Sequence, residues 1–273
     1  NGNALTEGTD YTVTYDKEDF TNVTGDITVT ITGTGNYGGT VTRKYKITPK
    51  EVTIVVDNKS KTYGEDDPTF TGTVGTLVNE NDLGTVTYGR KTEDANKEDA
   101  GDDITLVPTY TANSNYTVQV TEGKLTITAK SIIIPDPEDP EDPEKAKDMV
   151  ANDPTDVVYN GEDQKWVPTL KDGETTLVKD TDYTVTYSSD TKNVGTVTVT
   201  ITGKDNYSGT VTRTYQINPA TLTVVTPTDN KVYDGTALTK AGSVSGWVKN
   251  ETAPFSTTGT QTEVGSSDNT YEI

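Results

Sequence analysis

The stretch Thr9-Asp10-Tyr11-Thr12-Val13-Thr14-Tyr15 occurs a second time as Thr181-Asp182-Tyr183-Thr184-Val185-Thr186-Tyr187. In both copies tyrosine and valine alternate with threonine, the period-two pattern of a β-strand with one apolar and one wet face. The similarity continues after a loop that is two residues shorter in the second copy. It covers Ile31-Thr32-Gly33 and Ile201-Thr202-Gly203, Asn36-Tyr37 and Asn206-Tyr207, and Gly39-Thr40-Val41-Thr42-Arg43 and Gly209-Thr210-Val211-Thr212-Arg213. A shared register over this length indicates duplicated modules.

Further segments alternate in the same way and predict additional strands. They are Ile27 to Ile31, Val197 to Ile201, Val52 to Val56, Tyr116 to Val120, Leu125 to Ile127 and Leu222 to Val224. Glycine, asparagine, aspartate and proline separate these segments and indicate turns. One face of each strand is apolar and the other is mostly threonine, as in antiparallel sheets that pack on one side. We therefore predict an all-β fold of tandem small β-sandwich (Ig-like) modules arranged as an elongated rod.

The composition excludes several classes of protein. The chain has 273 residues, which is enough for about two to four small modules. Its formal charge of −20 repels nucleic acid and anionic membranes, so we expect no nucleic-acid partner and no membrane insertion. The sequence has no Cys and no His. Disulfides, thiol nucleophiles, the usual zinc sites and His-based triads are therefore excluded.

The first type of module occurs in one complete and one partial copy. Residues 151–218 are predicted to form a complete Ig-like surface repeat. Residues 1–48 correspond to its back part only, because no counterpart of Val157 to Leu170 precedes them. The last strand of each copy leads almost directly into the next module through a proline, Pro49 or Pro219. Proline restricts its own backbone and that of the preceding residue, so we expect these joints to bend little.

The second type of module also occurs twice. Residues 49–134 are predicted to form a complete module, and residues 219–273 begin this type again. In the partial copy we place Tyr271 at the position of Tyr116, with the final strand missing. The chain therefore alternates between the two types of module.

An acidic, proline-rich linker is predicted at residues 135–150. Its prolines at 137, 140 and 143 match the three-residue turn of polyproline II, and its carboxylates repel one another. Ten such residues would span roughly 30 Å as a stiff spacer. Lys145 to Val150 is the only helical candidate in the chain, and it is short enough for one turn at most.

A tyrosine followed by a tight turn marks the start of three modules. The motifs are Tyr63-Gly64, Tyr159-Asn160-Gly161 and Tyr233-Asp234-Gly235. Asn-Gly and Asp-Gly suit the positive φ values of such turns. We expect each tyrosine to pack its ring and to hydrogen-bond its hydroxyl at a sheet corner.

The densest acidic loop, Glu93 to Asp103, is the one candidate for a metal site. Asp94, Asn96 and Glu98 alternate as at the start of an EF-hand loop. Asp99 stands where that motif needs glycine, and Thr105 where it needs the bidentate glutamate. The pattern favours a solvated loop. We expect no cofactor, with calcium as the only one left open.

Trp166 and Trp247 are the two candidates for glycan-binding residues, since tryptophan can stack on sugars. With one tryptophan per module, a packing role at a core or corner is the more common use. Two Trp and three Phe are too few to line several sugar clefts, so a two-carboxylate glycosidase is not favoured and we expect no enzyme. Intramolecular isopeptide or ester crosslinks stay open, because the sequence singles out no pair.

Several motifs resemble known surface-protein families. Lys61-Thr62-Tyr63-Gly64-Glu65-Asp66-Asp67-Pro68 resembles the start of an MBG module of the Tyr-Gly type, and Lys231-Val232-Tyr233-Asp234-Gly235-Thr236 the related YDG module. The first type of module is similar to Ig-like repeats of Firmicutes cell-wall adhesin-like proteins. The resemblance implies tandem β-modules at a bacterial surface. The mucin-binding association of some relatives does not transfer, because no sugar-contact motif matches residue by residue.

The sequence therefore favours stalk or spacer repeats of an adhesin-like protein of Gram-positive bacteria. Such repeats are extracellular and cell-wall-associated, and they project a distal domain from the envelope. The alternative is a glycan- or mucin-binding adhesion module. We expect host glycans or proteins to bind through domains outside these residues. We also expect a monomer, unless exposed edge strands pair with another chain.

Overall fold

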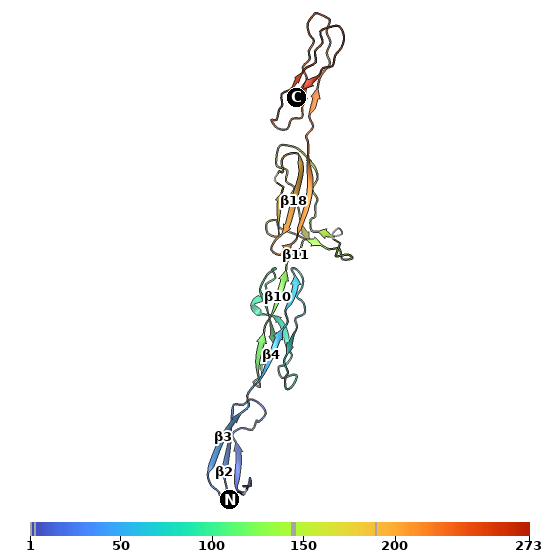
Figure 1. Ribbon diagram of the computed structural model, residues 1–273. Coiled ribbons are helices and arrows are strands. Elements are labelled where there is room, and N and C mark those ends of the chain that lie inside the picture. The colour runs from blue at the N-terminus through green and yellow to red at the C-terminus, as the bar shows by residue number, and fades with distance from the viewer. Residues whose placement is uncertain (1, 3, 143–145, 189) are drawn as a thin grey trace. The chain divides into compact units, whose positions relative to one another are not determined.

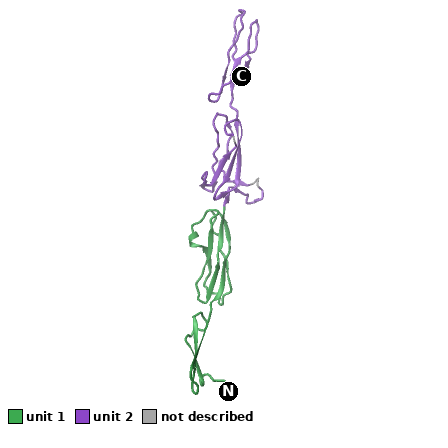
Figure 2. Cartoon of the chain, turned by 60° about the vertical axis from the view of Figure 1, so that its left-hand side comes forward, with its two compact units in different colours: residues 1–128 green, residues 129–273 purple. Residues whose placement is uncertain are grey.

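The computed structural model describes residue 2 and residues 4–142, 146–188 and 190–273. It divides into two compact units, Asn1–Thr128 and Ala129–Ile273 (Figure 2). The prediction of an all-β fold is confirmed: the described residues form β-strands and a single 3-10 turn, η1 (Thr92–Asp94). No helix in the described part of the chain is long and apolar enough to cross a membrane.

The first repeat forms an antiparallel three-stranded sheet at the start of unit 1 (Figure 1). Its strands are β1 (Tyr11–Tyr15), β2 (Asp26–Gly33) and β3 (Thr40–Lys46). The second repeat has the corresponding strands β17 (Tyr183–Tyr187), β18 (Gly195–Gly203) and β20 (Thr210–Asn218). The registers coincide, because Tyr11 pairs with Gly33 as Tyr183 pairs with Gly203. The sequence similarity therefore corresponds to the same backbone pairing.

The second module of unit 1 is built from two sheets. One has the order β6-β4-β9 and the other the order β5-β10-β8-β7. The strands are β4 (Lys50–Val56), β5 (Lys59–Thr62), β6 (Gly72–Val74), β7 (Thr87–Arg90), β8 (Ile104–Thr109), β9 (Tyr116–Thr121) and β10 (Gly123–Thr128). Both early strands pair in parallel with late ones, β4 with β9 and β5 with β10.

Two apolar clusters fill this module. The first consists of Val56, Ile104, Leu106, Leu125 and Ile127, and the second of Val52, Ile54, Leu83 and Tyr116. Tyr88 packs against both clusters. A Cβ on Gly72 would lie 2.5 Å from the Tyr88 ring and 2.5 Å from the carbonyl oxygen of Val55, so only glycine suits this position.

The boundary expected at residue 134 is wrong. β11 (Lys130–Ser131) pairs in parallel with β19 (Tyr207–Ser208), so the chain enters unit 2 directly after β10. The physical reason is burial: Ile132 is fully buried, and its backbone N–H donates to the carbonyl of Ser208. An apolar strand here belongs to the second repeat.

The spacer expected at residues 135–150 is also corrected. β12 (Ile133–Ile134) pairs with β13 (Lys147–Asp148), so the acidic segment is a loop whose two ends are held together (Figure 1). Asp139 and Asp142 donate backbone hydrogen bonds to carbonyls three residues earlier, which makes successive turns rather than polyproline II. Pro143 and Lys145 lie outside the described residues. The candidate helical turn is replaced by β13, which is anchored by the buried Met149.

The front of the second repeat covers the sheet of β17, β18 and β20. β14 (Val157–Val158) adds to the edge of β20 in parallel, so that the sheet order is β14-β20-β18-β17. A short hairpin of β15 (Lys171–Asp172) and β16 (Thr175–Thr176) follows. The apolar face of the sheet is buried beneath this front segment, with Val197, Val199, Ile201, Val211, Tyr215 and Ile217 in the core.

The last module of unit 2 has two isolated strand pairs. β21 (Thr223–Val225) pairs with β22 (Ser243–Ser245), and β23 (Ser256–Thr257) with β24 (Tyr271–Glu272). The predicted equivalence of Tyr271 and Tyr116 is wrong. Tyr271 lies in an antiparallel pair like that of β7 and β8, whereas Tyr116 pairs in parallel with Lys50 on β4. The described residues therefore contain no counterpart of β9 or β10 in this module.

Candidate functional site

Four ionic side chains form a network in the second module of unit 1. Lys61 lies on β5 and Arg90 on β7, while Asp67 and Glu98 come from loops. Lys61 Nζ lies 2.9 Å from Asp67 Oδ1 and 2.5 Å from Glu98 Oε2. Arg90 Nη2 lies 3.0 Å from Glu98 Oε1. The Lys61 side chain is only 5% exposed, so the network neutralises a charge that would be costly to bury alone.

The charges of this network set what it can do chemically. The hydrogen bond from Arg90, outweighing desolvation, lowers the pKa of Asp67. The hydrogen bond from Lys61 likewise lowers the pKa of Glu98. Desolvation opposes the charge on Lys61, but hydrogen bonds to Glu98 and Asp67 outweigh it and raise the Lys61 pKa. An ammonium group has no lone pair for attack on a carboxyl group. The arrangement therefore favours an ionic network of Lys61, Asp67, Arg90 and Glu98, here called the clasp, over an isopeptide bond.

The acidic loop uses its carboxylates within the protein. Asp94 is buried, lies 2.6 Å from Lys97 Nζ, and accepts a hydrogen bond from the backbone N–H of Thr105. Glu98 belongs to the network with Lys61. Among the described residues, no group of three or more acidic side chains is placed to hold a metal ion. The spacing of Asp94 and Glu98 is like the start of an EF-hand loop. In the structure, however, these carboxylates bind lysine side chains and a backbone N–H group.

The structure places the two tryptophans in different surroundings. Trp166 is half-buried beside Tyr215 and Gln164, where it lines a small hollow, and its indole Nε1 is buried. Its backbone carbonyl accepts a hydrogen bond from the Tyr187 hydroxyl at 2.7 Å. Trp247 is half-buried in the segment between β22 and β23. The structure does not bring the two together in one sugar-binding cleft.

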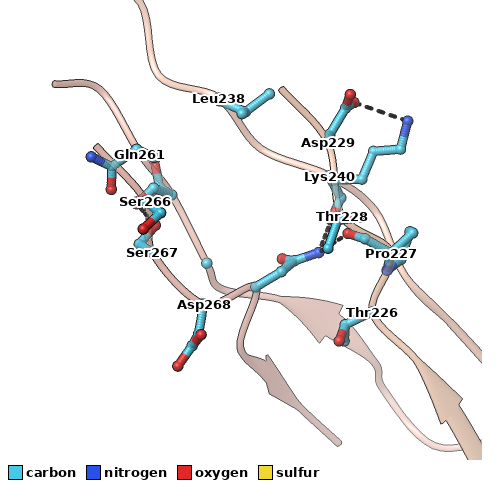
Figure 3. A pocket seen from close by; sticks show the side chains of 13 residues that line it. Thr226, Pro227, Thr228, Asp229, Leu238, Lys240, Gln261, Ser266, Ser267 and Asp268 are labelled. Atoms are coloured by element: carbon cyan, nitrogen blue, oxygen red, sulfur yellow. Dashed lines mark hydrogen bonds and ion pairs between the residues drawn. The ribbon is translucent and has the colours of Figure 1, made fainter. Parts of the chain in front are cut away.

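A pocket lies in the last module of unit 2, between residues 226–240 and 259–269 (Figure 3). Its wall is mostly polar, with Thr228, Gln261, Ser266, Ser267 and Asp268 around it. An ion pair of 3.1 Å joins Asp229 to Lys240 on one side. No aromatic ring lines this pocket among the described residues, so it lacks a stacking platform for sugar.

The segment that follows Asp229, one of the pocket's lining residues, differs from β5 of the second module of unit 1. In the second module of unit 1, β5 pairs only with β10. The corresponding residues near Lys231 and Tyr233 have no such partner and form no strand, and Val232 is almost fully exposed.

A feature that sequence reasoning missed is a row of tyrosine hydroxyls in the second repeat. Tyr183 donates to the carbonyl of Pro168 at 3.1 Å, Tyr187 to that of Trp166 at 2.7 Å, and Tyr215 to that of Gln164. Successive acceptors are two residues apart, so they lie on one side of an extended segment. The hydroxyl row thus holds the front segment by its backbone.

The loops between the first two strands of each repeat share a turn. Asp19 Oδ1 accepts from the backbone N–H groups of Thr21 and Asn22, at 2.8 and 2.9 Å. Asp190 Oδ1 accepts in the same way from Lys192 and Asn193, at 2.9 Å each. These loops differ in length and sequence, yet the Asp-x-x-Asn spacing gives the same local geometry. The signal was present in the sequence.

The family comparison assigns one of these modules. Residues 52–126 match the MBG domain (YGX type). This match supports the MBG module predicted at residues 49–134, and it coincides with the two-sheet body of β4 to β10. A search of curated proteins found no match for the chain.

Proposed function

We propose that this chain is a non-catalytic stalk of a bacterial cell-surface, adhesin-like protein. In this proposal alternating modules form a rod that projects a distal domain from the cell wall, and ligands bind elsewhere in the parent protein. Two observations support it: the MBG domain match, and the direct passage from one module into the next. Only residues 47–49 separate β3 from β4, and residues 219–222 separate β20 from β21.

The observation that carries the proposal is that the modules within each unit are bridged by turn residues. In unit 1, Asn115 Oδ1 accepts from the backbone N–H of Val23 at 2.7 Å, and Asn115 Nδ2 donates to Asn22 Oδ1 at 2.6 Å. One asparagine thus links the Asp-x-x-Asn turn of the first repeat to the MBG module. Such a contact limits bending at the joint.

Unit 2 has an analogous bridge at its joint. Lys249 forms an ion pair with Glu162, and the Tyr159 hydroxyl donates to Glu251. Gly161, in the turn between them, has φ +75° and would place a Cβ 3.2 Å from Val248. The tyrosine–turn motif at the start of the repeat is therefore also a joint element.

Small-angle X-ray scattering of residues 1–273 tests the proposal. A stalk gives a pair-distance distribution with one short cross-section dimension and a long tail. Asn115→Ala should broaden the distribution of lengths, whereas Asn58→Ala should leave it unchanged, because the hydrogen bond that Asn58 accepts from the Lys124 backbone N–H lies within one module. A single compact particle, or identical curves for both variants and the parent, would contradict the stalk.

Glycan or mucin binding is the rival function, and it has its own test. A glycan array at physiological salt should give no specific signal with this chain. Trp166→Phe keeps an aromatic packing group and the backbone acceptor used by Tyr187, so it is preferable to alanine. A reproducible signal that Trp166→Phe or Trp247→Phe abolishes, with an unchanged circular dichroism spectrum, would establish the rival.

A further inference from the structure

The turn Asn160-Gly161, at the front of the second repeat, joins two residues that can react with each other. The sequence contains one other Asn-Gly pair, Asn1-Gly2. Glycine has no Cβ, so its backbone nitrogen can come closer to the preceding side chain than that of any other residue. In an Asn-Gly pair this nitrogen is the atom that can attack the carboxamide carbon of the asparagine. The Asn160 side chain is exposed, so water reaches it.

The hydrogen bonds of this turn leave the reacting nitrogens free. Asn160 Oδ1 accepts from the backbone N–H of Glu162 at 2.9 Å. This donor stabilises negative charge on the oxygen, which is where charge develops when the carboxamide carbon is attacked. Within the described residues, neither Asn160 Nδ2 nor the Gly161 N–H forms a hydrogen bond. The attacking nitrogen and the leaving nitrogen therefore have no partner to release.

Asparagines in other turns hold their amide nitrogen. Asn193 donates from Nδ2 to Asp190 Oδ2 at 2.8 Å. Asn113, which precedes a serine, is half-buried and donates from Nδ2 to the carbonyl of Asp82 at 3.0 Å. Such bonds oppose both rotation of the carboxamide and departure of its nitrogen. Asn160 differs from these residues in its surroundings as well as in the glycine that follows it.

We propose that Asn160 is a site of spontaneous deamidation. The Gly161 nitrogen forms a bond to Asn160 Cγ, the Cγ–Nδ2 bond breaks, and the Gly161 proton passes through water to the leaving nitrogen, which departs as ammonia. The product is a succinimide ring. Water then opens this ring at either carbonyl and gives aspartate or isoaspartate. Water is the only co-reactant, and no atom is oxidised or reduced. This chemistry does not depend on the stalk function.

The products change a turn that contacts the following module. A Cβ on Gly161 would lie 3.2 Å from side-chain atoms of both Val248 and Lys249, so the turn packs closely on them. Lys249 also forms an ion pair with Glu162, the next residue of the turn. Isoaspartate adds one methylene to the main chain before Gly161 and so shifts Gly161 and Glu162 relative to Lys249. Deamidation therefore weakens this bridge.

The test incubates the whole chain at neutral pH and physiological temperature, with the freshly purified chain as reference. Peptide mapping by mass spectrometry locates each replacement of NH by O and separates residue 160 from residue 1. Asn160 should react at least about tenfold faster than Asn113, because only Asn160 is followed by a residue without a Cβ. Both aspartate and isoaspartate should form. A rate no higher than that of Asn113, or aspartate as the only product, would overturn the proposal.

Two variants separate the turn from the residue pair. Asn160→Gln should abolish the reaction at this position, because the longer side chain does not form the five-membered ring. Ser114→Gly gives Asn113 a following glycine, while its Nδ2 keeps the bond to Asp82. Asn113 in this variant should still react at least about threefold more slowly than Asn160, since that hydrogen bond must break first. Equal rates would refute the contribution of the turn.

Hydrogen exchange measures the effect on the bridge. The Glu251 N–H donates to the carbonyl of Val248 at 3.1 Å, in the segment that contacts the turn. Its exchange should become at least about threefold faster in the incubated chain, because the segment loses part of its support. The Asn160→Gln chain incubated in parallel should show no change. Unchanged exchange in a fully deamidated chain would refute the effect on the bridge.

Discussion

Arg90 binds Asp67 through two parallel hydrogen bonds, Nε to Oδ2 at 2.6 Å and Nη2 to Oδ1 at 2.5 Å. Because Lys61 contacts the same carboxylate, Asp67 joins two cations from different strands. Bidentate pairs of this kind are stronger than single contacts and fix the geometry of both groups. The clasp therefore ties the loop after Tyr63 to β5 and β7.

Asp67→Asn is expected to destabilise unit 1 by about 1–3 kcal/mol, because it leaves the buried Lys61 and Arg90 with one carboxylate instead of two. Urea unfolding followed by circular dichroism measures the change. Asp103→Asn is the matched control in the same module: its pair with Lys124 is exposed and should be worth less than about 1 kcal/mol. Equal effects of the two substitutions would contradict the clasp.

The same network predicts loss of stability in acid. Asp67 and Glu98 have pKa values lowered from the ordinary 3.8 and 4.5, by hydrogen bonds from Arg90 and Lys61 respectively. A lowered folded-state pKa gives stability that is full above the unfolded pKa and disappears as the pH falls through the folded one. The urea midpoint of unit 1 should therefore fall below about pH 4.5. Asp67→Asn should flatten this dependence, and an unchanged slope would argue against the network.

The tyrosine row predicts an opposite dependence at high pH. Desolvation raises the pKa of Tyr183, Tyr187 and Tyr215 above the ordinary 10.0, and in Tyr187 neighbouring tyrosines add to the effect. A raised folded-state pKa gives stability that is present below the unfolded pKa and is lost as the pH rises through the folded one. Unit 2 should thus lose stability above about pH 10. Tyr187→Phe should reduce this loss, measured as the change in urea midpoint with pH.

Glycines at equivalent turns predict different costs. Gly161 and Gly235 both have φ +75°. A Cβ added at Gly161 would contact Val248 and Lys249, whereas a Cβ added at Gly235 would have no atom within 4 Å. Gly235→Ala should cost only the left-handed backbone, about 1–2 kcal/mol. Gly161→Ala should cost more and should loosen the joint to Lys249. Thermal unfolding measures the cost of each substitution, and small-angle scattering measures the bending at the joint. Equal costs for the two variants would contradict a role of Gly161 in the joint.

The intact mass of the purified chain should equal the mass calculated from its sequence. The Lys61 ammonium is held in its charged form by Asp67 and Glu98, and Arg90 occupies the same carboxylates. An amide between Lys61 and Asp67 would release one water. A mass lower by one water, absent in Asp67→Asn, would show that the clasp had become covalent.

Local patterns in the sequence were sufficient for much of the fold. The alternation in Tyr11 to Tyr15 predicted a strand that the structure has with the same bounds. The turn glycines 64, 161 and 235 all have the predicted positive φ. These features depend on neighbouring residues only, which is why single-sequence reasoning finds them.

Long-range pairing was the part that the sequence could not supply. Lys130 and Tyr207 are neighbours in a parallel pair, and no local pattern in either segment indicates the other. The prolines after Ile134 suggested a spacer. This prediction failed because composition does not indicate whether the two ends of a segment pair with each other. The tyrosines of both repeats were visible in the sequence, but their acceptors are backbone carbonyls, which every residue carries.

The parallel pairing of first and last strands determines how the MBG module would bear tension. A pull applied between Lys50 at the start of β4 and Thr128 at the end of β10 draws β4 one way and β9, just before β10, the other. The hydrogen bonds between β4 and β9 lie across that direction, so they are loaded together in shear. An antiparallel hairpin pulled from its two ends would instead open one bond at a time. The strand order thus lets the module resist tension that is applied along the chain.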